Sequence, residues 1–342
     1  MSHLLKSRSG NSAFTLVELM IVIAIIGILA SLATVGVMKV LERSKMVTAR
    51  IEIGQLEAAV SAAKLDLGNA DELPSLIYVV KSIPDFASTV QIPSDLLIPY
   101  NSNTPVLSQD ITDLRIKTWT TFQKVFGRNV GKDPTNNTYY HPPVGAAAAL
   151  PVTINWPCNE KTIIQGMQAY MFWLGGMYSS TGGKYSFSGF STDKRDPCEM
   201  ASPKRKGPYF DFDSGRVKAI GSMPYSSYLT YVNGWDGEYT YFSNSSYKYY
   251  FKTPPTGATA NSNSSFSLIK DLNEYGAKVA PYVNGNVFFN AKTFQIIGSG
   301  QNQMFGPGGS GWTPGSGLYA IDANGYDDLS NFSSTQLGKK DE

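Results

Sequence analysis

Histidine is scarce in this chain, and its scarcity restricts the catalytic chemistry available. The 342 residues contain two histidines, of which His3 lies in the polar N-terminal segment. A Ser–His–Asp or Cys–His arrangement would therefore depend on His141 alone, beside Pro142–Pro143. We expect the protein not to be an enzyme. A membrane-anchored enzyme that uses carboxylates alone, such as a glycosidase, stays open as an alternative.

Charge is also low, because Asp, Glu, Lys and Arg make up only 16% of the residues. Two of the 29 basic residues, Lys6 and Arg8, lie within residues 1–13, which contain no acid, so the remainder has 27 basic and 27 acidic residues. A neutral chain has no general attraction to nucleic acid. The basic cluster at 203–208 is expected to be a solvated loop, with DNA contact as the alternative, and no nucleic-acid partner is expected.

An apolar run extends from Phe14 to Met38, about 25 residues. At 1.5 Å per residue, a helix of this length spans a hydrocarbon core about 30 Å thick. Lys6 and Arg8 before the run favour a cytoplasmic N-terminus and an external C-terminal domain. A secretory signal peptide is the rival interpretation, but its apolar region is shorter and is followed by small residues, whereas here small polar residues precede the run.

Glu18 lies near the start of this run, where a lone carboxylate is unfavourable. In the centre of a bilayer it costs roughly 2.5–3.5 kcal/mol, and such residues are usually functional. One interpretation is a charge that reaches back to the membrane surface. The other needs a cation at the same depth, and cleavage between Ala13 and Phe14 would create one, an α-amino group four residues from Glu18.

The stretch AFTLVELMIVIAIIGILASLA, residues 13–33, resembles the N-terminal segment of type IV pilins and type II secretion pseudopilins. The resemblance implies that a prepilin peptidase removes the leader, residues 1–13, and methylates the new N-terminus at Phe14. It also implies that Glu18 neutralises the N-terminal amine of a neighbouring subunit during assembly. The family prefers glycine before the cut, so Ala13 is expected to slow processing.

The helix is expected to continue beyond the membrane to residue 68, because no proline occurs from Val40 to Leu67 and Gly68 follows as a helix-ending residue. Apolar residues at heptad spacing form a stripe along it. They are Met46, Ala49, Ile53, Leu56, Val60, Ala63 and Leu67. The small alanines favour packing on a sheet, as in pilins, over a coiled-coil seam.

The region 69–342 is rich in proline, glycine and aromatic residues and is expected to be an extracytoplasmic globular domain. Residues 71–150 are predicted to be an irregular insert with a few short elements, and residues 162–178 a helix or a buried strand. Alternating tyrosines predict strands at 228–232, 238–243 and 247–251, and further strands are expected at 286–290 and 293–300. Asp236–Gly237 is a favoured hairpin dipeptide.

A helix first and strands afterwards predict an α+β fold. A long N-terminal hydrophobic helix, 14–68 with 14–38 in the membrane, is expected to pack on an antiparallel sheet, and a large loop-rich C-terminal region follows. Three C-terminal stretches, 172–197, 207–213 and 294–332, are similar to large prepilin-like proteins of planctomycete-type bacteria. The stretch NGWDGEYTYFS is similar to a C-terminal motif of major pseudopilins.

Two residue pairs are candidate sites in the C-terminal region. Cys158 and Cys198, the only cysteines, would face an oxidising compartment and are expected to form a disulfide, with two buried thiols as the alternative. Asp327 and Asp328 offer hard oxygen ligands for Ca²⁺, which major pseudopilins hold in their C-terminal loop. Because GSGQNQ lacks the acid of that loop, we expect a solvated or helix-capping pair and no cofactor, with Ca²⁺ binding as the alternative.

The resemblance implies a structural subunit of a type IV pilus-like filament or of a type II secretion pseudopilus, with a role in protein secretion in the second case. Its expected partners are the prepilin peptidase, other copies of itself and related pilins, and the inner-membrane assembly platform. It is expected to cross the inner membrane once before it enters the filament, with its C-terminal domain periplasmic or extracellular. A minor or tip pilin that acts as an adhesin is the alternative within the family.

Overall fold

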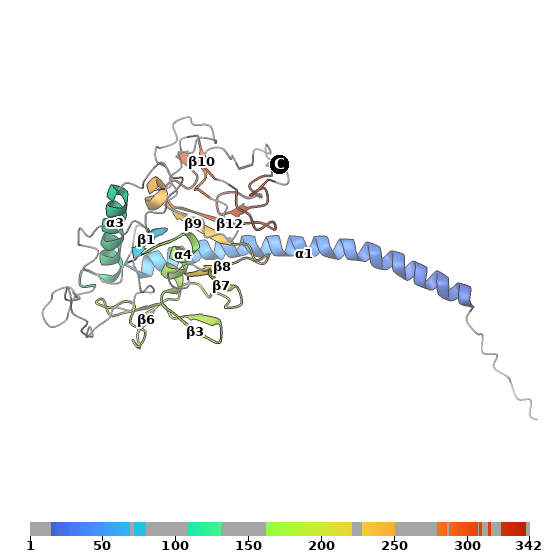
Figure 1. Cartoon of the computed structure of the whole chain (residues 1–342), viewed down its shortest axis with the longest axis horizontal. Coiled ribbons are helices and arrows are strands. Elements are labelled where there is room, and N and C mark those ends of the chain that lie inside the picture. Colours follow the sequence, from blue (N-terminus) through green and yellow to red (C-terminus); the bar gives the residue numbers. More distant parts are fainter. Residues whose placement is uncertain are drawn as a thin grey trace, which may run out of the picture. The chain divides into compact units, whose positions relative to one another are not determined.

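The computed structural model describes residues 15–68, 72–79, 108–130, 162–220, 228–249, 279–285, 287–306, 308–309, 314–315 and 323–339. The chain divides into two compact units, Met1–Val47 and Thr48–Glu342. Helix α1, Leu16–Asp66, is long, as expected, and contributes residues to both units (Figure 1).

In the first unit, α1 presents an apolar surface that no other described residue covers. An 18-residue window of the helix reaches a mean hydropathy of 2.7, and none of it is buried within the chain. By length and composition this helix can cross a membrane. Two hydroxyl groups within its apolar run bond to their own helix, with Ser31 Oγ donating to the carbonyl of Ile28 and Thr34 Oγ1 to that of Ala30, both at 2.8 Å. The hydroxyl donors at these two positions therefore need no hydrogen-bond partner outside the helix.

In the second unit, the C-terminal part of α1 buries the predicted stripe. The buried residues recur every three or four positions, as one face of a helix requires. They are Ala49, Ile53, Leu56, Ala59, Val60, Ala63 and Leu67. Met46, the first residue of the predicted stripe, is half-buried. The prediction of a helix that packs on the globular region is thus confirmed, and Gly68, with φ of +91°, follows its end.

The other described elements are short strands, two α-helices and a 3-10 helix. In chain order they are β1 (Leu76–Val79), α3 (Ser108–Phe126), β2 (Thr162–Gln165), α4 (Gly166–Gly175), β3 (Tyr178–Thr181), β4 (Lys184–Phe187), β5 (Phe190–Ser191), β6 (Arg205–Lys206), β7 (Val217–Ile220), β8 (Tyr228–Tyr231), β9 (Tyr239–Ser243), the 3-10 helix η1 (Asn244–Tyr249), β10 (Val283–Asn284), β11 (Val287–Phe288), β12 (Phe294–Gly298) and β13 (Leu329–Ser330). Each pairing between these strands is antiparallel. The predicted α+β class is confirmed.

The centre of the second unit is α4, whose ten residues are all buried. Tyr170 donates to the carbonyl of Leu56 on α1 at 2.5 Å, and Trp173 Nε1 donates to the carbonyl of Pro74 at 2.9 Å. The Phe122 ring of α3 packs against Trp173, with centroids 5.9 Å apart. α4 therefore connects α1, α3 and the segment before β1 through buried aromatic side chains.

A three-stranded sheet has the order β13-β12-β9. Its strand β9 packs on α4, and Tyr239 of β9 donates its hydroxyl to Glu52 of α1. Phe294 of β12 pairs with Ser243 of β9, and Ile297 pairs with Ser330 of β13. Ser243 also exchanges hydrogen bonds with Ser75, because the backbone N–H of each donates to the hydroxyl of the other at 2.9 and 3.0 Å. These bonds join β9 to the segment that leads into β1.

Several local expectations are revised by the structure. Residues 162–178 contain both a strand, β2, and a helix, α4, rather than one or the other. The region 71–150, expected to hold only short elements, contains the 19-residue helix α3, and residues 131–150 lie outside the described part. The prediction of a strand at 247–251 is wrong for residues 247–249, which belong to η1, Asn244–Tyr249. Residues 250 and 251 lie outside the described part. Ser246 and Ser243 hydroxyls bond locally at 2.9 Å, and such bonds favour turns over strands.

Two leucines on α1 test the burial of the stripe. Leu56 is fully buried, whereas Leu65 is 75% exposed. We expect Leu56→Ala to lower the free energy of unfolding by about 2–5 kcal/mol, because it leaves a cavity in the core. Leu65→Ala should change it by about 0.5 kcal/mol or less. Denaturant unfolding of the full chain in detergent, followed by near-UV circular dichroism, measures both. Equal effects would contradict the assigned face.

Candidate functional site

The first candidate site is the N-terminal end of α1, where Thr15 and Glu18 bond to each other. The Thr15 backbone N–H donates to Glu18 Oε2 at 2.8 Å, and the Glu18 backbone N–H donates to Thr15 Oγ1 at 3.2 Å. The Thr15 hydroxyl also donates to Glu18 Oε2, at 2.9 Å. This reciprocal arrangement is a capping box, in which two side chains satisfy N–H groups that the first helical turn leaves without partners.

The capping box gives the Glu18 carboxylate a local role that the sequence analysis missed. The signal was present in the sequence, since Thr-Leu-Val-Glu is a Ser/Thr-x-x-Glu pattern before an apolar run. A carboxylate at this end also interacts favourably with the helix dipole. Glu18 is exposed, and large apolar side chains that remain exposed surround it in the sequence, from Leu16 to Met20. The negative charge is therefore held at the helix start. Ala13 and Phe14, the predicted cleavage residues, lie outside the described residues.

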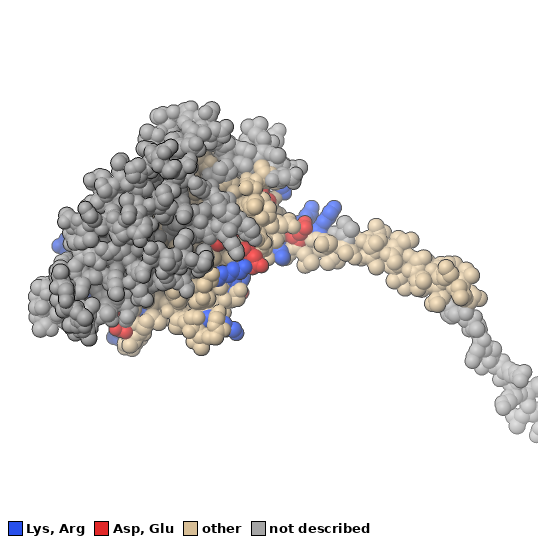
Figure 2. All heavy atoms as spheres, viewed as in Figure 1, with Lys and Arg blue, Asp and Glu red and all other residues tan. Residues whose placement is uncertain are grey.

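The surface after the apolar run carries charge of both signs. Lys39, Glu42, Arg43 and Lys45 are exposed on α1. On the face shown in Figure 2, the helix is free of red and blue over its apolar length, and charged side chains gather beyond it. This change from apolar to charged surface is typical of the point where a helix leaves a hydrocarbon environment.

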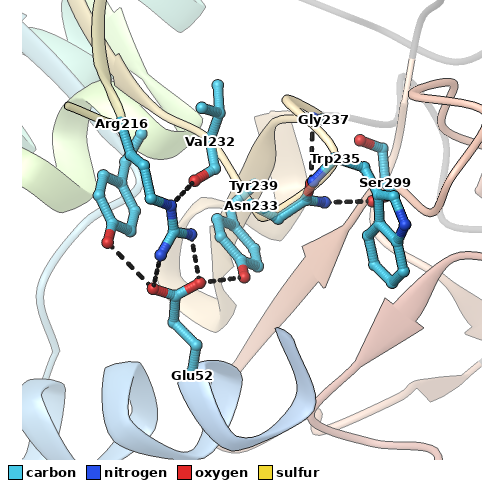
Figure 3. Close-up of polar contacts among 9 residues, drawn as sticks. Glu52, Arg216, Val232, Asn233, Trp235, Gly237, Tyr239 and Ser299 are labelled. Atoms are coloured by element: carbon cyan, nitrogen blue, oxygen red, sulfur yellow. Dashed lines mark hydrogen bonds and ion pairs between the residues drawn. The ribbon is translucent and has the colours of Figure 1, made fainter. Parts of the chain in front are cut away.

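A second cluster lies where α1 contacts strands β8 and β9, and its centre is Glu52. Arg216 donates to both carboxylate oxygens, with Nη1 2.7 Å from Oε1 and Nη2 2.6 Å from Oε2. Tyr231 and Tyr239 donate their hydroxyls to the same carboxylate at 3.0 and 2.5 Å (Figure 3). Arg216 Nε also donates to the carbonyl of Val232 at 2.8 Å. Glu52 is thus buried with four hydrogen bonds from two strands and the segment before them.

Burial and charge act together in this cluster. Burial, strengthened by the Glu52 carboxylate, raises the pKa of Tyr231 and of Tyr239 well above the ordinary tyrosine value, so both hydroxyls stay protonated as donors. Burial lowers the pKa of Arg216, but its bonds to Glu52 outweigh that effect and the net pKa is raised. A bidentate Arg–carboxylate pair of this kind is strong and directional. The cluster therefore fixes α1 at one position on the strands of this unit.

Sequence reasoning missed Glu52 because its charge suggested an exposed position. Helical spacing was the available signal: Glu52 follows Ala49 by three residues and precedes Leu56 by four, so it lies beside the buried stripe. Its partner Arg216 lies 164 residues further along the chain, and nothing local in the sequence identifies it.

The side chain of Asn233, two residues after Tyr231 of the Glu52 cluster, holds the turn between β8 and β9. Asn233 Oδ1 accepts from the backbone N–H groups of Trp235 and Gly237 at 2.8 and 3.0 Å, and Nδ2 donates to the carbonyl of Ser299 at 2.5 Å (Figure 3). A Cβ at Gly237 would lie 2.4 Å from the Ser299 hydroxyl, so glycine is required there. The predicted Asp236–Gly237 turn is confirmed, with Val232 and Glu238 bridged across it.

The predicted cysteine pair is only partly described. Cys198 is fully buried, and its backbone N–H donates to Asp196 Oδ1 at 3.2 Å, whereas Cys158 lies outside the described residues. The Cys158–Cys198 disulfide therefore stays a prediction. Burial raises the pKa of Asp196 to about 6, against the opposing effect of the Cys198 N–H.

The predicted acid pair bonds to backbone groups of the segment after β12. Asp328 is fully buried, and its oxygens accept from the N–H groups of Gly300 and Gly306 at 3.3 and 2.9 Å. Asp327 Oδ2 accepts from the N–H of Asn302 at 3.1 Å. Burial raises the pKa of Asp328 well above its ordinary value. Asp328 is thus not the solvated acid that the sequence favoured; it closes a loop.

The same contacts test how well the pair fits Ca²⁺. Calcium takes six to eight oxygen ligands, and three of the four carboxylate oxygens here already face N–H donors. Within the described part of the chain, no group of three or more His, Cys, Asp or Glu side chains could hold a metal ion. The described residues therefore do not form a calcium cage, and calcium binding by Asp327 and Asp328 stays an untested prediction.

Comparison with known proteins identifies the class of the N-terminal segment. Residues 8–34 match the model of the prokaryotic N-terminal methylation motif, which covers the capping box and most of the apolar run. The chain therefore begins with a prepilin-type methylation segment, as the resemblance implied.

Two curated relatives match over the N-terminal part. A type IV major fimbrial protein FimA of Dichelobacter nodosus is 43% identical over 65 residues, which cover 19% of this chain and 41% of that protein. A second FimA of the same organism is 42% identical over 65 residues, 19% of this chain and 42% of the relative. The chain thus spans about two fifths of the length of these relatives. No solved structure matches it significantly. The predicted similarity to planctomycete-type proteins finds no support in these matches.

Two glutamates on α1, one buried and one exposed, test the role of the Glu52 cluster. Glu52→Gln removes the charge that balances Arg216, and breaking a buried pair costs roughly 3–5 kcal/mol. The loss should be somewhat smaller here, because the Arg216 side chain keeps 26% exposure. Glu57→Gln, at an exposed position on the same helix, should change stability by about 0.5 kcal/mol or less. Denaturant unfolding of both variants measures this, and a Glu52→Gln protein as stable as wild type would contradict the role.

Proposed function

We propose that this protein is a structural subunit of a type IV pilus-like or type II secretion pseudopilus filament, assembled through its N-terminal helix. The observation that carries the proposal is the combination of a matched methylation motif with an apolar stretch of α1 that no other described residue covers. The two relatives are type IV major fimbrial proteins, which supports the filament class. Residues 69–342 would lie outside the filament core.

Before assembly, α1 anchors the protein in the inner membrane, with the N-terminus in the cytoplasm and the C-terminal region in the periplasm. Lys6 and Arg8 before the apolar run support this orientation. A prepilin peptidase cuts between Ala13 and Phe14 and methylates Phe14. The inner-membrane assembly platform and other copies of the chain or related pilins are the partners of the next step.

The Glu18 carboxylate then pairs with the Phe14 amine of a neighbour. Its capping bonds to Thr15 place the charge at the helix start, where a neighbour displaced along the filament axis can reach it. In an apolar surrounding, an opposite charge is the favourable partner for that carboxylate. The pair would give adjacent subunits a fixed axial offset.

The first test is processing. Mass spectrometry of the protein extracted from membranes should find an N-terminus at methylated Phe14, because the motif spans the cut. Ala13→Gly should speed the cleavage, since the family prefers glycine before the cut. An intact Met1 terminus in cells with an active prepilin peptidase would refute this part of the proposal.

The second test separates the charge of Glu18 from its capping role. Glu18→Gln keeps a side-chain oxygen for the cap but removes the charge. It should sharply lower the ratio of sheared filament to membrane-bound monomer, because an uncompensated buried amine costs about 3–5 kcal/mol. Glu18→Val should lower this ratio as much as Glu18→Gln does. Glu18→Asp should lower it less, since the charge remains but its reach is one methylene shorter.

Thr15→Val is the matched control, because it removes the capping hydroxyl and leaves the charge. It should lower filament yield far less than Glu18→Gln. If instead Thr15→Val lowers filament yield and Glu18→Gln assembles like wild type, Glu18 only caps the helix. Cleavage is measured in each variant, so that a processing defect is not read as an assembly defect.

A further inference from the structure

A cavity of about 540 Å³ lies between the β3–β4 hairpin and the segment 208–214. Its lining combines three kinds of group. Aromatic rings come from Tyr185 and Phe210, both half-buried, and exposed charges come from Lys184, Asp211 and Asp213. Serine and threonine hydroxyls of both strands complete the wall. The volume is within the range of small-molecule sites.

The two walls of the cavity are held in place by contacts that do not involve its opening. The β3–β4 register aligns Ser179 with Ser186, which both line the cavity. On the other wall, Tyr209 donates its backbone N–H to the carbonyl of Leu174 at 2.7 Å and its hydroxyl to Asp66 at 2.6 Å. Phe212 is buried, with its ring 5.0 Å from that of Phe187 and 5.2 Å from that of Tyr231. Such a site requires little ordering when a ligand binds.

The charged side chains of the lining are available for a ligand. Neither Lys184 nor Asp211 takes part in an ion pair within the part of the chain that the structure describes. The Asp213 carboxylate accepts a bond from the Gly215 N–H at 2.9 Å through Oδ1. The lining therefore offers carboxylate acceptors, an ammonium donor and hydroxyls that serve as both.

The mixture of charges restricts the ligand. With two carboxylates and one ammonium, the lining disfavours an anionic ligand, and the Lys184 ammonium offsets part of the attraction that the aspartates exert on a cation. A neutral ligand that carries many hydroxyls can donate to the carboxylates and accept from the ammonium. If it also has an apolar C–H face, the half-exposed rings can pack against that face.

We propose that this cavity binds a neutral saccharide. Asp211 and Asp213 accept hydrogen bonds from sugar hydroxyls, Lys184 donates to them, and the rings of Tyr185 and Phe210 contact the C–H face of a sugar ring. The proposal rests on the lining alone and does not depend on filament assembly.

The experiment is calorimetric titration of the full chain in a detergent without a sugar headgroup. The probes are neutral oligosaccharides of glucose, galactose, mannose and N-acetylglucosamine, with hexalysine and hexaglutamate as charged probes. We expect at least one neutral saccharide to bind. Asp211→Asn and Lys184→Gln should each weaken that binding about tenfold or more, because each removes a charged hydrogen-bond partner.

Asp236→Asn and Lys218→Gln are matched controls. These two exposed residues form an ion pair 2.9 Å long and do not line the cavity, so their variants remove the same charges elsewhere and should bind like wild type. Unchanged unfolding midpoints of all four variants show that the fold is retained. The proposal is overturned if no neutral saccharide binds, if binding is equal in all variants, or if only a charged peptide binds.

Discussion

The buried carboxylate of Glu52 is the interaction on which the arrangement of the second unit depends. It receives hydrogen bonds from a guanidinium and two tyrosine hydroxyls that the strand region supplies, while Glu52 itself comes from α1. The hydrophobic effect that buries the stripe depends on apolar area and is non-directional. The hydrogen bonds to the buried carboxylate are directional, and a shift of the helix would leave that charge without partners.

The same helix meets two different requirements along its length. Apart from half-buried Met46, the described apolar side chains up to Val47 are exposed, and from Ala49 on one face is buried against the strands and α4. Several of its polar groups follow the same division. In the first part Ser31 and Thr34 bond to their own helix, and in the second part Glu52 and Asp66 bond to other elements. One continuous helix can therefore belong to an apolar environment and to a folded domain.

The sequence was informative wherever a structure depends on local spacing. The buried stripe of α1, the Asp236–Gly237 turn and strands β8 and β9 follow from apolar periodicity and turn chemistry. Residues 247–249 were wrongly predicted to be in a strand, because alternating tyrosines do not reveal that nearby serine hydroxyls bond to one another. The Glu52–Arg216 pair could not be predicted, because its partners meet only after the strands have folded onto α1.

Ser31 and Thr34 have a mechanical consequence. Since both hydroxyls donate to carbonyls of the preceding turn, their protons are not available to a neighbouring helix, and a helix packed on this stretch would contact it mainly through dispersion between aliphatic side chains. Separating two such helices would therefore break no hydrogen bond donated by Ser31 or Thr34.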